Sequence, residues 1–278
     1  MSECASRLRV WTFLALVVFV IGHFITLSLR GTSAFTQYVR AAEIGTHAFA
    51  LPAILRAKQV RLSFASEIVV TTAVSILYHT IRNYTNMDYT PYQRLDHGLS
   101  TGLICVVFLK YIISLHHALG LVLALTATAS SLDTGNILAS GATAAVLTAV
   151  IAIPFADKAA QSLLRGVVSV LTLGATPPRA NDLSYTASQR GRLFCAFLFQ
   201  IASVFAYFQG GDDDDGTGNE EFWHSLWHAC GFTSLFLLTD VIAEKRSKRD
   251  RERVNPPRKH RRYYTLAQSA SHGGFRFT

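Results

Sequence analysis

Blocks of apolar residues recur along this chain, and most of them have roughly the 17 to 25 residues that a helix needs to cross a lipid bilayer. Of the 278 residues, 50% are hydrophobic and only 16% are charged. Because the hydrocarbon core offers no water to backbone N–H and C=O groups, each block must satisfy them within its own helix. The pattern predicts an all-α, polytopic membrane protein and argues against a soluble domain.

We expect a core of seven spans in residues 41–243, after an amino-terminal segment, 1–40, that holds one extra apolar run. The seven core spans are predicted at Ala41 to Leu55, Ser63 to Ile81, Leu95 to Leu115, His116 to Ser131, Ile137 to Phe155, Arg192 to Phe208 and Phe222 to Ala243. The extra run, Val10 to Leu29, is either an uncleaved signal anchor or a signal peptide cut near Gly31 to Ala34; its length favours the anchor. Leu163 to Leu173 is short for a span and predicts an interfacial or re-entrant helix.

Basic residues set the predicted orientation of these spans. The tail 244–278 holds eleven Lys and Arg against three acids, so the excess of +8 belongs entirely to this tail, which we expect to be disordered. Directly after a span, such a tail indicates a cytosolic end more readily than a nucleic-acid site. The basic turn Arg56 to Arg61 and the loop Asp157 to Arg192 then fall on the same side. We predict a multi-pass protein of an endomembrane or the plasma membrane, with a cytosolic carboxyl terminus.

Two features lie in loops predicted to face the lumen or the cell exterior. Asn83-Tyr84-Thr85 is an N-glycosylation acceptor pattern, which fits a loop on that side. Asp212 to Asp215 is a run of four aspartates, but it lacks the alternating ligands of a calcium loop, so a solvated acidic turn is the favoured interpretation. The four cysteines show no disulfide framework.

Five polar residues from three spans are predicted to lie at one depth, near the external side. His224 and His228 are four apart in the last span and so share a helix face. His79 ends the second core span, with Ser75 one turn deeper, and Asp96 begins the third. Polar side chains within a span are costly and tend to face the bundle interior, where they serve a site. The predicted orientation of the spans rests on charge alone, so the agreement in depth of these five residues is independent evidence for one site.

Three neutral imidazoles with an open fourth position match a catalytic zinc site. We therefore predict Zn²⁺ ligation by His79, His224 and His228. Asp96 is the predicted proton acceptor or water-orienting group, and Ser75 the predicted hydrogen-bond donor to an oxyanion.

The remaining polar residues of the spans are given other roles. His97 is adjacent to Asp96 and is assigned to the surroundings of the site or to an interface. His23 and His47 are isolated in sequence and are expected to be satisfied within the bundle, and His116-His117 falls at a cytosolic helix end. Glu67 and Asp240 fall near cytosolic helix ends, where carboxylates can pair with the basic turns.

These residues resemble the signature of the CREST superfamily of seven-span membrane proteins, which includes alkaline ceramidases and the progestin and adipoQ receptors. That signature is a serine and a histidine four apart in the second span, an aspartate in the third, and H-x-x-x-H in the seventh. The five positions are occupied by Ser75, His79, Asp96, His224 and His228. Tyr78-His79, Arg94 to His97 and His224 to His228 are most similar to the myomaker-like branch, whereas the acidic Trp-Cys-Glu calcium motif of alkaline ceramidases has no counterpart.

The resemblance implies a zinc-dependent hydrolase that cleaves an amide or ester bond in a membrane lipid, either ceramide-like or of glycerolipid or GPI type. The alternative is a myomaker-like or receptor-like protein whose zinc site is structural and supports no turnover. A channel or transporter is least supported, because the polar residues gather at one depth and do not line a path across the membrane.

Overall fold

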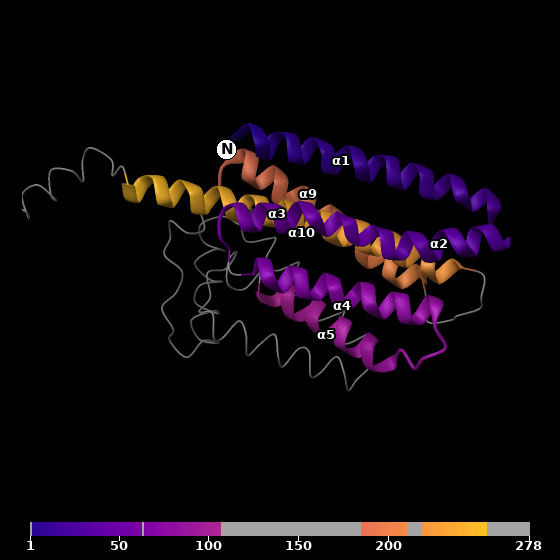
Figure 1. Cartoon of the computed structure of the whole chain (residues 1–278). Helices are drawn as coiled ribbons and strands as arrows, with labels where there is room; N and C mark the ends of the chain where they lie inside the picture. The colour runs from indigo at the N-terminus through magenta and orange to yellow at the C-terminus, as the bar shows by residue number, and fades with distance from the viewer. Residues whose placement is uncertain (1, 63, 107–184, 211–217, 255–278) are drawn as a thin grey trace, which may run out of the picture.

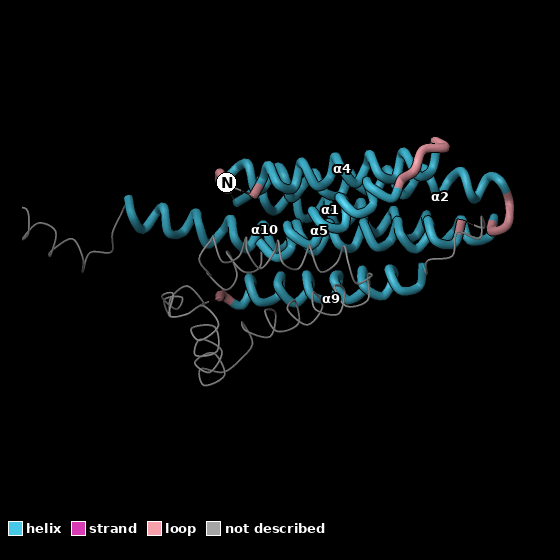
Figure 2. Tube along the Cα trace, turned by 90° about the horizontal axis from the view of Figure 1, so that it is seen from below, coloured by secondary structure: helices cyan, strands magenta, loops and turns pink. Residues whose placement is uncertain are grey.

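The computed structural model describes residues 2–62, 64–106, 185–210 and 218–254, and all regular elements within these ranges are helical (Figure 1). In chain order they are α1 (Ser2–Ile25), η1 (Thr26–Leu29), α2 (Ser33–Gly45), η2 (Thr46–Ala50), α3 (Leu51–Gln59), α4 (Ala65–Tyr84), α5 (Thr90–Val106), α9 (Ala187–Gly210) and α10 (Asn219–Val254). Helix α10 packs against α1, α2, η2, α3 and α9, while α4 packs against α3 and α5. Helix α10 therefore connects the outer helix α1 to the rest of the bundle (Figures 1 and 2).

Three helical segments in the described part of the chain are long and apolar enough to cross a membrane: Ala5–Leu29, Ala187–Gly210 and Asn219–Arg251. The first has many apolar side chains on its outer surface, among them Trp11 and Val18, which are 68% and 70% exposed. Such a surface suits contact with lipid chains. These observations support a helical membrane protein. The predicted spans 116–131 and 137–155, the short segment 163–173 and the aspartates 212–215 lie outside the described residues.

The first predicted core span is longer and less regular than expected. Its helical path begins at Ser33, because the Thr32 side chain accepts a hydrogen bond from the Phe35 backbone N–H (3.1 Å) and caps α2. The α-helix is then followed by the 3-10 helix η2, and α3 begins after it. Pro52 has no N–H to donate to the preceding turn, which favours such a break. The predicted boundary between residues 40 and 41 therefore falls inside α2.

Two apolar clusters lie along the bundle, with polar residues between them. One cluster includes Phe35 and Val39 of α2 and Phe222 and Leu226 of α10. The other joins α3, α4 and α10 and includes Ala50, Ala53, Ala57, Ile68, Phe236 and Val241. Along both α2–α3 and α10, the chain between the two clusters carries buried polar residues, namely Glu43, Thr46, His47, His224 and His228. Packing on either side therefore encloses a polar layer.

Asp240 organises the end of the bundle away from that layer. Its carboxylate accepts hydrogen bonds from Arg9 (2.6 Å), Arg56 (2.7 Å) and Arg192 (2.6 Å), and its side chain is 1% exposed. The expected pairing of this carboxylate with basic residues is present. Because Asp240 follows His228 by twelve residues of one helix, the two lie about 18 Å apart along α10.

The amino-terminal helix α1 is attached to α10 near both of its ends. Besides the Arg9 to Asp240 bond, the His23 ring nitrogen Nε2 donates a hydrogen bond to the Phe222 carbonyl (2.8 Å), and the His23 and Phe222 rings stack with centroids 4.1 Å apart. His23 is fully buried, as expected for a histidine satisfied within the bundle.

Candidate metal centre

The three histidines predicted as ligands come together between α4 and α10. The ring centroids of His79, His224 and His228 are 4.9 to 5.0 Å from one another. All three side chains are buried, with exposed fractions between 0% and 8%. The pairing of His224 with His228 follows from the four-residue spacing on one helix, and the approach of His79 follows from the packing of α4 in the bundle.

Two groups of buried side chains in the described residues have metal-ligating atoms within 4.8 Å of one another. One group is His47, His79 and His228, and the other is Glu43, His79 and His224. His79 belongs to both groups, whereas the predicted ligand set of His79, His224 and His228 is not one of the two: His228 groups with His47 and His224 groups with Glu43. The structure therefore provides a centre that could hold a metal ion, and it adds two residues from α2 and η2 that the sequence analysis did not assign to it.

The two ring nitrogens of His79 face different partners. Its Nε2 lies 2.9 Å from Nε2 of His228, while its Nδ1 lies 3.1 Å from Oε1 of Glu43. A carboxylate beside one imidazole nitrogen favours a proton there and leaves the lone pair of the other nitrogen for a metal. His79 is thus oriented with Nε2 toward the histidine group.

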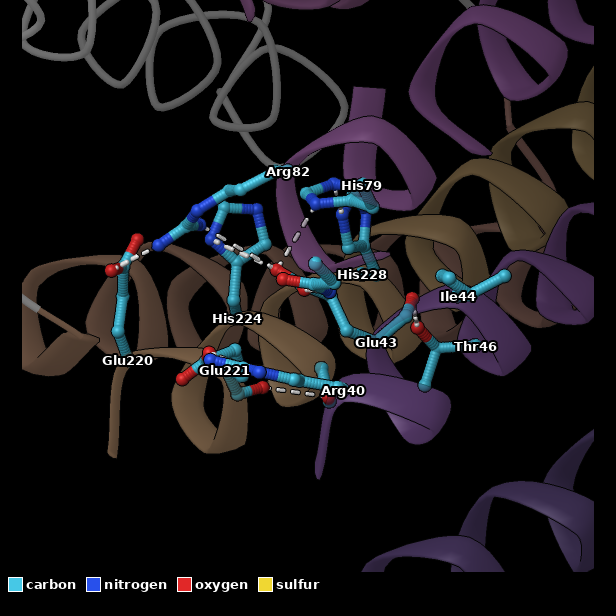
Figure 3. Close-up of polar contacts among 12 residues, drawn as sticks. Arg40, Glu43, Ile44, Thr46, His79, Arg82, Glu220, Glu221, His224 and His228 are labelled. Atoms are coloured by element: carbon cyan, nitrogen blue, oxygen red, sulfur yellow. Dashed lines mark hydrogen bonds and ion pairs between the residues drawn. The ribbon is translucent and has the colours of Figure 1, made fainter. Parts of the chain in front are cut away.

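The carboxylate of Glu43 is completely buried among polar groups from three helices (Figure 3). Its Oε2 accepts a hydrogen bond from the Asn83 side-chain amide (2.6 Å), and its Oε1 lies 3.9 Å from both an Arg82 nitrogen and Nδ1 of His224. Arg82 in turn pairs with Glu220. A buried carboxylate needs such partners, because an isolated one would carry a large desolvation penalty.

Asn83 therefore has a structural role that conflicts with its predicted one. The nitrogen that N-glycosylation would modify is the one that donates to Glu43. The acceptor pattern at Asn83-Tyr84-Thr85 fits a lumenal or extracellular loop, and in the structure the Asn83 amide donates a hydrogen bond to the Glu43 carboxylate.

The other two predicted site residues, Ser75 and Asp96, are buried on neighbouring helices α4 and α5, with 1% and 0% exposure. The two carboxylate oxygens of Asp96 and the Ser75 hydroxyl are buried and make no hydrogen bond within the described part of the chain. Asp96 interacts electrostatically with Glu43. These residues thus belong to the same polar region as the histidines.

A cavity of about 80 Å³ borders this region. Its lining is mainly apolar, but Ser75, Ser100 and His228 contribute polar atoms at its wall. The apolar part comes from Leu103, Phe232, Leu235 and Leu238 of α5 and α10. A cavity of this size holds only a few atoms, since typical ligand pockets measure about 300 to 1,000 Å³, but its mixture of apolar walls and a few polar groups is the lining such pockets have.

Replacement of Glu43 by Gln tests its role beside His79. The amide keeps nearly the same volume but removes the negative charge that orients the His79 ring. Loss of an orienting group of this kind typically lowers metal affinity about 10- to 100-fold. We expect a drop of that size in a zinc titration monitored by competition with a chelator. Glu221→Gln is the matched control. Glu221 pairs with Arg40 (3.3 Å) and, within the described part of the chain, with no histidine of the centre. An equal loss of zinc affinity in both variants would contradict the role of Glu43 in orienting His79.

Comparison of the chain with protein-family models, with curated proteins and with solved structures finds no match to any of them.

Proposed function

We propose that the protein is a zinc-dependent membrane hydrolase that cleaves an amide or ester bond in a lipid. The observation that carries the proposal is the buried set of histidine and carboxylate donors beside an apolar cavity that Ser75 and His228 both line. Membership of the CREST superfamily, with seven core spans, is part of the same proposal and rests on the five signature residues.

The donor set fits a zinc ion. Ligands at about 2.0 to 2.1 Å in a tetrahedral arrangement lie roughly 3.4 Å from one another. The Nε2 atoms of His79 and His228 are 2.9 Å apart, so a shift of a few tenths of an ångström would seat both on one ion. Imidazole is a ligand that zinc takes in hydrolytic enzymes, and a carboxylate that orients one of the rings, as Glu43 does for His79, is a usual neighbour of such a site.

The residues around the centre have distinct roles in this proposal. A bound zinc ion would act as a Lewis acid on the scissile carbonyl and activate water for attack. Asp96 accepts the proton that the attacking water loses and returns it to the departing amine or alcohol. Ser75 donates a hydrogen bond to the oxygen that becomes negative as the carbonyl carbon becomes tetrahedral. The neighbouring apolar side chains hold a lipid chain with its polar bond against these groups.

The proposal also assigns the side of the membrane from which the lipid enters. The histidine centre lies about 18 Å along α10 from Asp240 and its three arginines. If basic residues mark the cytosolic side, the centre lies toward the lumenal or extracellular leaflet. We propose that a membrane lipid enters between the helices from that leaflet.

Asp96→Asn tests turnover separately from metal binding. We expect the purified variant to keep about one zinc per chain, while hydrolysis falls by roughly 10²- to 10⁴-fold because the proton acceptor is lost. The measurements are metal analysis of the purified protein and lipid profiling of cells that express wild type or variant. Asp88→Asn is the control, since Asp88 is fully exposed before α5 and its Oδ1 accepts the Thr90 N–H (2.9 Å), which an amide oxygen can also do.

His224→Ala completes the test. Loss of both zinc and lipid product in this variant supports a catalytic centre. Zinc at one per chain in the wild type, with a lipid profile unchanged from cells that lack the protein, would overturn the hydrolase proposal. In that case the metal centre would be better described as the structural zinc site of a receptor or fusion protein.

A further inference from the structure

We infer that His47 is a ligand of the metal at this centre, so that the first core helix contributes directly to the site. The inference deepens the proposed metal centre and does not depend on whether the protein hydrolyses a lipid. The three ligands are then His47, His79 and His228, whose donor atoms form one group, and a fourth position stays open. It goes beyond the signature residues, which come only from α4, α5 and α10.

The hydrogen bonds of His47 determine which of its nitrogens is available. Its Nδ1 lies 3.1 Å from the Glu43 carbonyl oxygen and 3.0 Å from the Ile44 carbonyl oxygen. A carbonyl oxygen can only accept, so Nδ1 must carry the proton. The neutral ring therefore has its lone pair on Nε2, which is the form in which histidine binds a metal.

The Nε2 atom of His47 is the nitrogen left to bind a metal. It is buried, in a side chain that is 3% exposed, and it has no hydrogen-bond partner among the described residues. Its ligand atom lies within 4.8 Å of those of His79 and His228, and its ring centroid is 4.3 Å from that of His228. A buried nitrogen lone pair without a partner is unfavourable unless something binds it.

The orientations of His47 and His79 match. Each has its Nδ1 beside an oxygen, the Glu43 and Ile44 carbonyls for His47 and the Glu43 carboxylate for His79. In both rings Nε2 therefore carries the lone pair, and the His79 Nε2 lies 2.9 Å from that of His228. Imidazoles oriented by an oxygen on the second nitrogen are the usual arrangement in metal sites.

The local backbone holds His47 in this position. The Thr46 hydroxyl donates to the Glu43 carbonyl (2.8 Å), the same oxygen that His47 Nδ1 contacts. These side-chain bonds compete with the regular helical bonds and accompany the change from α2 to the tighter η2. The turn that carries His47 is thus fixed by the site's own residues.

The test compares metal binding by wild type, His47→Asn and His47→Gln in the full-length protein. The Asn side-chain amide can reproduce the Nδ1–H donor to the backbone carbonyls but has no group at the Nε2 position, whereas Gln places an amide near Nε2. We expect His47→Asn to lower zinc affinity by about tenfold or more and to change the visible spectrum of the cobalt-substituted protein. The Gln variant should lose less.

His23→Ala is the matched control, because His23 is also a buried histidine bonded to a backbone carbonyl but makes that bond at Phe222. Its stability should fall while its zinc affinity and cobalt spectrum stay at wild-type values. Wild-type affinity and an unchanged cobalt spectrum in His47→Asn would overturn the inference. Absence of lipid turnover in the wild type would not contradict the inference about His47, since every measurement in this test is one of metal binding.

Discussion

Replacement of His79 by Ala is expected to abolish metal binding, with a loss of affinity greater than about 100-fold, the upper end of what loss of an orienting group alone costs. The reason is that His79 belongs to both groups of donor atoms, whereas each other donor belongs to one. Its removal also leaves the Glu43 carboxylate without the imidazole 3.1 Å away. The measurement is zinc per chain after purification, together with a chelator competition titration.

Leu77→Ala is the control for this variant. Leu77 is two residues away on the same helix but lies on the outer face, where it is 46% exposed. Its truncation should leave zinc content unchanged. If His79→Ala retained stoichiometric zinc with wild-type affinity, the metal centre as described would be wrong, because no donor group would then remain complete.

The sequence was sufficient to predict the helical class and the residues that approach one another from α4 and α10. Both predictions depend on local rules: apolar blocks of spanning length, and a four-residue spacing that puts His224 and His228 on one face. Polar residues in such blocks also point to a site by themselves.

Glu43 and His47 were missed for a physical reason. The sequence shows that they are four residues apart. However, Glu43 falls near the predicted start of the first core span, and none of the predicted site residues lies near His47 in the sequence. Their role depends on the packing of α2 and η2 against α10 and on the Nδ1 bonds that direct His47 inward. The earlier start of α2, at Ser33, puts Glu43 in the last turn of that helix, next to His79.

The second large effect is expected from Asp240→Asn, which should destabilise the fold without affecting the metal centre directly. One carboxylate faces three guanidinium groups, and the side chains of Arg56 and Arg192 are only 6% and 12% exposed. Removal of the negative charge leaves the buried Arg56 guanidinium without a carboxylate partner and Arg192 with only Glu244, and breaking a buried pair typically costs about 3 to 5 kcal/mol. For a chain of this size that corresponds to a fall in Tm of roughly 6 to 20 °C.

Two companion variants separate this effect from a general loss of acidic charge. Asp250→Asn removes a carboxylate from the exposed part of the same helix and should leave Tm within about 1 °C or 2 °C, because exposed charges contribute little. Arg9→Ala should cost no more than about 1 kcal/mol, since Arg9 is the most exposed of the three arginines, at 34%. An Asp240→Asn protein as stable as wild type would show that the arginines are satisfied without this carboxylate.

The metal readout makes the Asp240 prediction specific. Because Asp240 lies about 18 Å along α10 from His228, folded Asp240→Asn protein should bind zinc with wild-type affinity below its own Tm. His79→Ala should show the opposite pattern, with metal lost and the Asp240 cluster intact. The two results together would show that two parts of α10 have separate functions. The histidines with Glu43 bind an ion. Asp240 holds α1, α3 and α9 to the central helix through Arg9, Arg56 and Arg192.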